Sequence, residues 1–287
     1  MAEPLPVCHL NDELLPLRDA RISPLDRSCL FGDGVYEVVA VRHGRARRLA
    51  SNLARLRRSL KELRIRDPHG EPQWRALIEA LVRANGGGDL YVYVQVSRGT
   101  EYGRNHAPLP DLEPTVFAFC APLPAPSAEV LERGVSCITA QDTRWARCDI
   151  KSVALLANVL LRQQAVEAGA SETILLREGW LTDASSSTVY AILDREIVAP
   201  PNSTRLLPGT TRNLLEELAD AHGIARRSIA VSEAQLRGAD EIWLSAATRG
   251  VIAVTALDGK PVGTGRPGPL WRRMHELIEA YWSDTST

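Results

Sequence analysis

A proline-rich segment near the middle of the chain, APLPAPS at 121–127, limits how its 287 residues can fold. Proline lacks a backbone N–H and has a fixed φ angle, so three prolines in seven residues interrupt helix and sheet alike. The chain also exceeds the usual size of one hydrophobic core. We therefore predict that 121–127 is a linker between an N-terminal domain, residues 1–120, and a C-terminal domain, residues 128–287.

Both predicted domains mix strand-like and helix-like patterns. Leucines recur at helical spacing in SNLARLRRSLKEL (51–63), whereas YVYVQVS (91–97) alternates like a strand. Further helices are predicted over 72–84, 152–168 and 271–282, and over the segment that follows the LLPGTTR loop and ends at Gly223. Further strands are predicted at VYEVVAV (35–41), TVFAFCA (115–121), GVSCITA (134–140), ETILLRE, STVYAIL and DEIWLSAA (240–247). This mixture predicts an α/β or α+β protein.

Composition argues against several classes of protein. The formal net charge is -1, so nothing in the bulk charge favours binding to nucleic acid or to an anionic membrane. The five cysteines are scattered without a C-x-x-C pair, which argues against a disulfide framework or a zinc site, and we expect no bound metal. The N-terminus has no signal-peptide pattern and no apolar run approaches about 18 residues. We therefore expect a cytoplasmic protein without a membrane span.

Lys151, in the stretch RCDIKS, is notable because the chain contains only three lysines among 34 Lys and Arg residues. An arginine neither loses its proton nor forms an imine, whereas a lysine can do both. A helix that begins at Ser152 would place its positive dipole end beside this amine and favour the neutral form. One interpretation is a Schiff-base lysine. The other is a partly exposed lysine at a helix start, which the local sequence alone favours.

Three other segments carry candidate binding groups. LPGTTRN (207–213) opens a predicted helix with a glycine and two threonines, a pattern typical of a phosphate site or of a simple Thr-capped helix. RGTEYGRNHAPLP (98–110) offers arginine and histidine to a carboxylate, or is a solvated loop. LTDASSSTV (181–189) sets Asp183 before three serines, as a hydrogen-bonded turn or as a carboxylate for a basic cofactor nitrogen.

Together these segments resemble the fold-type IV pyridoxal-phosphate enzymes, and among them the D-amino acid aminotransferases. The resemblance spans roughly residues 20–265 and rests on FGDGVYEVV, RGTEYGRNH, RWARCDIKSVALLANVL, SETILLREGWLTDASSSTVY and LPGTTR. It implies a small N-terminal α/β domain and a larger C-terminal α/β domain with a pseudo-barrel, which carries the lysine. It also implies a homodimer whose substrates are small molecules.

The resemblance implies roles for individual residues. Lys151 would hold pyridoxal 5'-phosphate as a Schiff base and move the proton between the substrate α-carbon and the cofactor. Asp183 would pair with the pyridinium nitrogen, and Arg55 would bind the phosphate. The other implied cofactor contacts are Leu207, Thr210, Thr211, Ala247 and Thr248. The substrate α-carboxylate would be bound by Tyr36, Arg104 and His106, the last two on a loop lent by the neighbouring subunit.

Three features of the sequence depart from the family pattern. Asp183 stands where glutamate is usual, and its side chain is one methylene shorter, so it would reach the ring directly, shift the ring or act through a water. Weaker ring protonation would slow the reaction, and we expect activity that is not necessarily high. Ala246 and Ala247 stand where hydroxyl residues are common, which leaves backbone N–H groups or Thr248 to contact the phosphate. Asn52 stands where a histidine usually precedes the phosphate-binding arginine.

The expected reaction moves the amino group of a D-amino acid to a 2-oxo acid, with D-alanine and 2-oxoglutarate as the expected pair. The Arg104–His106 pair is the reason for choosing D-amino acids. Within the same fold, a branched-chain L-amino acid aminotransferase, an (R)-amine transaminase and an aminodeoxychorismate lyase stay open as alternatives. A non-catalytic vitamin-B6-binding protein is the alternative from another class.

Overall fold

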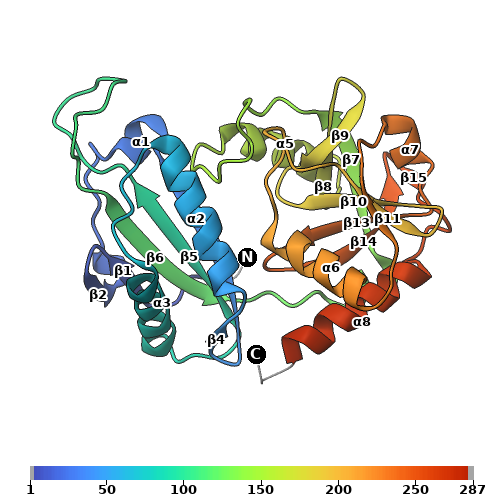
Figure 1. Ribbon diagram of the computed structural model, residues 1–287, viewed down its shortest axis with the longest axis horizontal. Helices are drawn as coiled ribbons and strands as arrows, with labels where there is room; N and C mark the ends of the chain where they lie inside the picture. The colour runs from blue at the N-terminus through green and yellow to red at the C-terminus, as the bar shows by residue number, and fades with distance from the viewer. Residues whose placement is uncertain (1–2, 284–287) are drawn as a thin grey trace. The chain divides into compact units, whose positions relative to one another are not determined.

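The computed structural model describes residues 3–283, which form two compact units (Figure 1). The first unit comprises the chain up to Pro124 together with the short segment Ile150–Leu155. The second comprises Ala125–Asp149 and the chain from Leu156 onward. Each unit has its own sheet and its own buried apolar core.

The first unit is built on a six-stranded antiparallel sheet with the strand order β2-β1-β6-β5-β3-β4. Its strands are β1 (Val7–Leu10), β2 (Glu13–Pro16), β3 (Gly34–Arg42), β4 (Arg45–Ala46), β5 (Leu90–Ser97) and β6 (Thr115–Pro122). Its helices are the 3-10 helix η1 (Leu17–Asp19) and the α-helices α1 (Arg27–Phe31), α2 (Leu49–Leu63) and α3 (Glu71–Ala84).

The core of the first unit lies between this sheet and the helices α2 and α3 (Figure 1). The leucines of α2 recur every three to four residues and point inward together. On β5 the even-numbered residues from Leu90 to Val96 are buried in this core. Successive side chains of a strand point to opposite faces, so Tyr91, Tyr93 and Gln95 project from the other face of the sheet.

The segment Ile150–Leu155 runs beside β3, although it comes more than a hundred residues later in the chain. The Tyr36 N–H donates to the Lys151 carbonyl at 2.9 Å, and the Val153 N–H donates to the Gly34 carbonyl at 3.0 Å. These bonds place Lys151 in the first unit, whereas the sequence predicts it in the C-terminal domain.

The second unit is built on a nine-stranded mixed sheet with the order β12-β11-β10-β13-β14-β7-β8-β9, in which β15 pairs with β14. Its strands are β7 (Val135–Gln141), β8 (Glu172–Arg177), β9 (Trp180–Ala184), β10 (Thr188–Leu193), β11 (Glu196–Ala199), β12 (Arg226–Ser228), β13 (Glu241–Ala246), β14 (Gly250–Leu257) and β15 (Lys260–Pro261). Its helices are α4 (Ala128–Arg133), α5 (Leu156–Glu167), α6 (Thr210–Ala221), α7 (Glu233–Arg237) and α8 (Pro269–Ser283).

This sheet is strongly curved, as its connections require. β9 ends one side of the sheet and β10 lies five strands away, yet only Ser185, Ser186 and Ser187 join them. Five strand spacings in a flat sheet would measure about 24 Å, more than the roughly 14 Å that such a short link can span. The sheet therefore curls so that β9 approaches β10, which agrees with the barrel-like form implied by the family resemblance.

Most predicted elements are confirmed, but one helix begins later than predicted and one strand, β9, is not predicted. The predicted helices over 51–63, 72–84 and 271–282 correspond to α2, α3 and α8. The helix predicted over 152–168 begins four residues late, at Leu156, because the preceding residues bond to β3 instead. The sequence does not predict β9, because Thr182 and Asp183 interrupt its apolar pattern and are buried only through tertiary hydrogen bonds.

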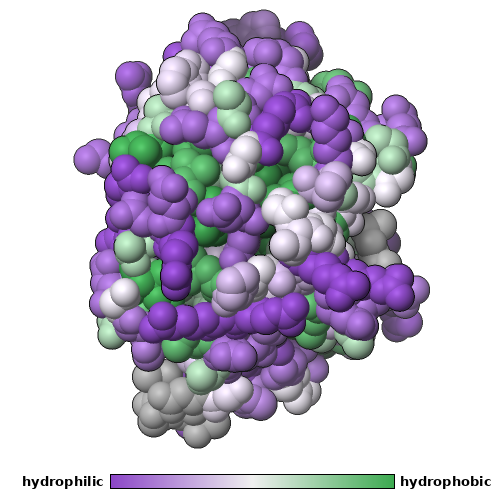
Figure 2. Space-filling view, turned by 90° about the vertical axis from the view of Figure 1, so that its right-hand side faces the viewer, coloured by the Kyte–Doolittle hydropathy of each residue, from purple (hydrophilic) through white to green (hydrophobic). Residues whose placement is uncertain are grey.

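Polar and apolar side chains are interspersed on the surface (Figure 2). On the face shown in Figure 2, hydrophilic side chains make up most of the outer surface, and hydrophobic ones appear in patches between them. Among residues 3–283, every helix is too short or too polar to cross a membrane. The same residues contain no group of three or more His, Cys, Asp or Glu side chains that could hold a metal ion.

Candidate active site

Lys151 lies in irregular backbone, five residues before α5, and not at a helix start. Its own N–H donates to Ser59 Oγ of α2 at 3.3 Å, and its carbonyl accepts from Tyr36 of β3. Ser152 does not cap a helix: its Oγ accepts from the nearby Ala154 N–H at 3.2 Å. The predicted influence of a helix dipole on Lys151 is therefore wrong, and bonds to two other elements fix its backbone instead.

The Lys151 amine lies over an aromatic ring. Its Nζ is 4.1 Å from the centroid of the Tyr36 ring, within the range of a cation–π contact. The Tyr36 ring in turn stacks on Tyr93 at 5.5 Å, on the face of the sheet opposite the core. Burial and the nearby Tyr36 raise the pKa of Tyr93 to about 12, so its hydroxyl stays protonated and donates to Gln95 Oε1. The amine thus rests on a wall of two stacked tyrosine rings.

Arg55 and Glu37 form a buried bidentate pair near this wall. Arg55 Nε and Nη2 donate to the two Glu37 carboxylate oxygens at 2.7 and 2.9 Å. Asn52 Nδ2 also donates to Glu37, at 2.8 Å, and to the Val38 carbonyl. The departure from histidine at position 52 therefore supplies an amide that helps hold Glu37. The pair fixes the plane of the Arg55 guanidinium, the group predicted to bind the cofactor phosphate.

Arg104 and His106 are both exposed and meet on one aromatic ring. The Arg104 guanidinium carbon lies 5.4 Å from the Phe31 ring centroid, and the His106 ring centroid lies 5.5 Å from it. Tyr36 is the third predicted substrate residue. Among residues 3–283, no hydrogen bond, ring contact or cation–π contact joins Tyr36 to Arg104 or His106. Within one chain, Arg104 and His106 therefore meet on the Phe31 ring, whereas Tyr36 contacts Lys151.

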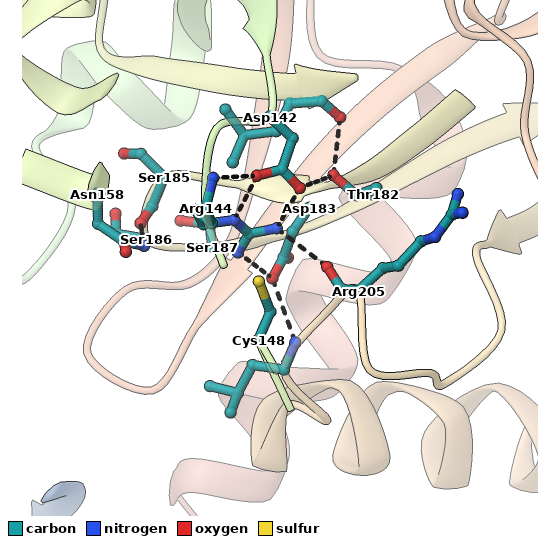
Figure 3. A network of polar contacts seen from close by, with 12 residues as sticks. Asp142, Arg144, Cys148, Asn158, Thr182, Asp183, Ser185, Ser186, Ser187 and Arg205 are labelled. Carbon is teal, nitrogen blue, oxygen red and sulfur yellow. Dashed lines mark hydrogen bonds and ion pairs between the residues drawn. The ribbon is translucent and has the colours of Figure 1, made fainter. Parts of the chain in front are cut away.

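Asp183 lies near the end of β9 in the second unit (Figure 3). It is buried, and its Oδ2 is 3.3 Å from Arg144 Nη1 and accepts from the Leu207 N–H at 3.4 Å. Burial raises the pKa of Asp183 to about 6, although Arg144 and the backbone N–H groups of Leu207 and Ala184 favour the carboxylate. These long contacts leave a carboxylate only partly compensated, which suits it to accept a further N–H.

Arg144 is bound more tightly to a second acid, Asp142. Its Nε and Nη2 donate to the two Asp142 oxygens at 3.0 and 3.1 Å, and Nη2 also donates to the Arg205 carbonyl (Figure 3). Thr182 and Arg177 add contacts to Asp142 at 2.8 and 3.1 Å. Burial alone would raise the pKa of Asp142, but these bonds lower it. The two carboxylates that share Arg144 thus have pKa values shifted in opposite directions.

The serine turn after Asp183 is organised by Glu172, a fully buried residue of β8. Ser185 and Ser186 donate their hydroxyls to its two oxygens, and Ser187 donates at 3.2 Å. The Thr173 N–H adds a bond at 3.0 Å. Three hydroxyl donors satisfy a carboxylate that has no basic partner among these bonds, and the turn that closes β9 onto β10 is thereby fixed.

The predicted phosphate residues lie at the start of α6. Thr210 and Thr211 open this helix and are buried. The N-cap residue is Gly209, so no side chain caps the N–H groups at the helix start. A Cβ on Gly209 would lie 3.0 Å from Thr188 Oγ1, so the backbone approaches β10 closely. Leu207 is tied to Asp183 through its N–H. The second unit thus brings the predicted ring partner and the predicted phosphate site together.

Ala247 and Thr248 lie in the turn between β13 and β14 and are half-buried. The Arg249 N–H closes this turn on the Ala246 carbonyl at 3.2 Å. The turn follows Ser245, whose hydroxyl is 2.9 Å from Tyr190 Oη. Its N–H groups and the Thr248 hydroxyl are the donors that the turn offers.

Four charged residues that support the site were not predicted from the sequence: Glu37, Asp142, Arg144 and Glu172. A partial signal existed for two of them, because an acid within an otherwise apolar strand, as in VYEVVAV and ETILL, has to find partners when it is buried. The pairing of Arg144 with Asp183 carries no such signal, since Asp183 comes from β9, a distant part of the sequence.

Known proteins with similar sequences and structures agree with this geometry. The family model for amino-transferase class IV matches residues 34–257. The D-alanine aminotransferase of Bacillus licheniformis is 38% identical over 269 residues, which cover 94% of each chain. That of Listeria innocua is 35% identical over 272 residues, which cover 94% of this chain and 93% of its own.

Among solved structures, a hypothetical aminotransferase from Mycobacterium tuberculosis in its PLP-bound form has a TM-score of 0.84 at 26% identity. The match covers 96% of this chain and 99% of that one. The chain therefore belongs to the class IV aminotransferase family, the fold-type IV enzymes.

Proposed function

We propose that this protein is a pyridoxal-phosphate-dependent D-amino acid aminotransferase. It transfers the amino group of a D-amino acid, with D-alanine as the expected donor, to a 2-oxo acid such as 2-oxoglutarate. The observation that carries the choice of substrate is the Arg104–His106 pair, two carboxylate-binding side chains held on one Phe31 ring. Relatives named D-alanine aminotransferase, 35–38% identical over nearly the whole chain, support the same choice.

The residues present fit a phosphorylated pyridinium cofactor. An N-terminus of a 12-residue helix without a side-chain cap, such as that of α6, offers backbone N–H groups to a phosphate. Buried Asp183, with its raised pKa, is an acceptor for the ring N–H. When bound, pyridoxal phosphate supplies a ring that withdraws electrons from the substrate α-carbon. Arg55, Leu207, Thr210, Thr211, Ala247 and Thr248 are its proposed further contacts.

Lys151 is the proposed general base and acid. Its amine would remove the proton from the substrate α-carbon and then deliver it to the cofactor, and transfer of this kind is typically worth about 10² to 10⁴ in rate. The Tyr36 ring 4.1 Å from Nζ restricts where the amine can move and stabilises its cationic form between the two transfers. Asp183 accepts from the ring nitrogen and keeps its proton in place.

We also propose that the protein is a homodimer. Leu156, Val159, Leu160 and Val166 are 56–73% exposed and lie along one side of α5, an apolar stripe that a second copy would cover. Within the described chain no hydrogen bond, ring contact or cation–π contact joins Tyr36 to Arg104 or His106, so a loop supplied by the partner subunit would complete the carboxylate site. The five free thiols fit a reducing compartment, and we infer a cytoplasmic location.

An assay of D-alanine against L-valine, each with 2-oxoglutarate, tests the function. Turnover of D-alanine is expected, and turnover of L-valine alone would show a branched-chain L-enzyme instead. Borohydride reduction followed by peptide mapping should attach the cofactor to Lys151. Exposed Lys61 and Lys260 are internal controls that should stay unmodified. A Lys151→Ala variant that still turned over D-alanine would contradict the proposed mechanism.

A further inference from the structure

The loop that carries Arg104 and His106 lacks regular structure. It leaves the sheet at Ser97, the last residue of β5, and returns at Thr115, the first residue of β6. Tyr102, near its middle, is 94% exposed. An exposed loop without regular structure does not by itself fix the relative positions of two side chains, so a buried group must hold its backbone.

Arg27 is that group. It is the first residue of α1 and only 2% exposed. Its Nη1 donates to the Asn105 carbonyl at 2.8 Å, and its Nη2 donates to the His106 carbonyl at 3.0 Å. One rigid guanidinium thus binds two successive carbonyls, which fixes the backbone on both sides of the His106 side chain.

Two carboxylates hold the Arg27 guanidinium in place. Its Nε donates to Asp33 Oδ2 at 2.8 Å, and its Nη1 donates to Glu101 Oε1 at 2.8 Å. Arg98 binds Asp33 from the other side through Nε and Nη2, at 2.7 and 3.0 Å. The second Glu101 oxygen accepts from the Leu109 N–H at 3.1 Å. Both sides of the loop are thereby tied to one nearly buried ionic cluster.

The same arginine also lies against the aromatic ring that supports the substrate side chains. The Arg27 guanidinium carbon is 4.5 Å from the Phe31 ring centroid, one helical turn further along α1. Arg104 and His106 contact this ring at 5.4 and 5.5 Å. Arg27 therefore controls the backbone of the loop and the surface on which its two binding side chains rest.

We propose that Arg27 is a positioning residue for recognition of the substrate α-carboxylate, acting through Arg104 and His106; this inference rests on the proposed function. Arg27 does not touch the substrate. It holds the loop so that both side chains reach the carboxylate together. Loss of this order weakens substrate binding while the proton transfer at Lys151 proceeds as before.

Arg27→Lys is the informative variant, because a lysine keeps the charge between Asp33 and Glu101 but lacks the planar fork that binds both carbonyls. We expect the KM for D-alanine to rise about tenfold or more, since each bond to a charged donor contributes substantially to the loop's order. The kcat should stay within about twofold, and deuterium uptake over residues 98–112 should increase. Arg42→Lys, in the exposed pair with Asp89, is the matched control and should leave both readouts unchanged.

Measurement of the wild-type protein first separates the two hypotheses. Absence of D-alanine turnover by the wild type would defeat the proposed function, and this inference with it. If the wild type is active, an unchanged KM in Arg27→Lys would overturn the inference alone. A fall in kcat with an unchanged KM would do the same, because it would place Arg27 in the chemical step. The deuterium uptake of the loop verifies that any rise in KM comes from loop order.

Discussion

Arg144 Nη1 lies 3.3 Å from Asp183 Oδ2, and both side chains are less than a tenth exposed. The same guanidinium is bidentate to Asp142 at 3.0 and 3.1 Å. One buried cation therefore serves two buried carboxylates, and it favours Asp142, whose pKa is lowered while that of Asp183 is raised to about 6. The carboxylate that is left partly uncompensated is the one that the proposed function assigns to the ring nitrogen.

Replacement of Arg144 by methionine should destabilise the apoprotein strongly at high pH and weakly at low pH. At pH 8 the substitution leaves buried Asp183 without its cation and Asp142 with Arg177 alone, a loss of about 3–5 kcal/mol in the free energy of unfolding. At pH 5 more of this charge is removed by protonation, so the loss shrinks. Urea denaturation at both pH values measures the difference.

Arg205→Met is the matched control for this experiment. The Arg205 side chain makes an exposed pair with Glu178, so its removal should cost less than about 1 kcal/mol, while its backbone carbonyl still accepts from Arg144. An equal loss for Arg144→Met at pH 5 and pH 8 would mean that packing, and not charge, explains the role of Arg144.

Asp183→Asn should stabilise the apoprotein while it impairs cofactor binding and transamination. A buried acid with a raised pKa makes its full contribution to stability when protonated, below its unfolded pKa of about 4, and this contribution is lost as the pH rises through about 6. The variant stays neutral, so its free energy of unfolding should rise relative to that of the wild type between about pH 4 and pH 6. Above pH 6 the difference should stay constant, at no more than about 3 kcal/mol.

Denaturation of both apoproteins across this pH range, with cofactor affinity measured at pH 8, tests the prediction for Asp183. A variant that is less stable than the wild type at pH 8 would show that the ionised Asp183 is well compensated in the fold. If the variant bound the cofactor as tightly as the wild type does, Asp183 would not be the partner of the ring nitrogen. For the wild-type apoprotein, affinity for the cofactor should decline as the pH falls below about 6, because protonated Asp183 no longer accepts from the ring.

Local patterns in the sequence predict the elements of this fold well and the pairings between distant residues poorly. Leucine spacing predicts α2, and alternation of apolar residues predicts β5, because in each element one face packs against the hydrophobic core. The apolar run after Lys151 predicts a helix that begins at Ser152, yet bonds to β3 and to Ser59 hold Lys151 five residues before α5. Such bonds join residues about a hundred positions apart, and the periodicity of a local sequence pattern cannot predict them.

The candidate site divides in the same way. Motif resemblance identifies Lys151, Asp183 and the Arg104–His106 pair, since these side chains are the ones proposed to perform the chemistry. It does not identify Arg27 or Arg144, which act on other protein groups and whose partners come from several segments. Supporting charges of this kind become visible only when the fold brings their carboxylates and carbonyls together.

Replacement of Glu172 should loosen the serine turn that closes β9 onto β10. Glu172→Gln keeps the volume but removes the charge and turns one acceptor oxygen into a donor, so the serine hydroxyls lose part of their partner. We expect a loss of about 1–3 kcal/mol in the free energy of unfolding, and a greater loss for Glu172→Ala. Cofactor affinity should fall as well, because Asp183 lies at the start of this turn.

Glu178→Gln is the control for the Glu172 variants, since Glu178 is 72% exposed and follows the same strand. It should change the free energy of unfolding by less than about 1 kcal/mol. The result would contradict the proposed role of Glu172 if both glutamine variants unfolded at the same urea concentration.

Charge placed on the apolar stripe of α5 should convert the proposed dimer to monomers. Leu160 is 58% exposed, so Leu160→Glu leaves the core of the chain intact but puts a carboxylate where a second copy would pack. Sedimentation should show a monomer of about half the wild-type mass with an unchanged circular dichroism spectrum. Turnover of D-alanine should fall when the dimer dissociates, because Arg104 and His106 of one chain would no longer reach the site of another.

Ile229→Glu is the control for this prediction. It makes the same change at a residue that is 38% exposed and lies outside α5, and this variant should remain a dimer. A Leu160→Glu protein that stays dimeric and fully active would place the subunit contact elsewhere.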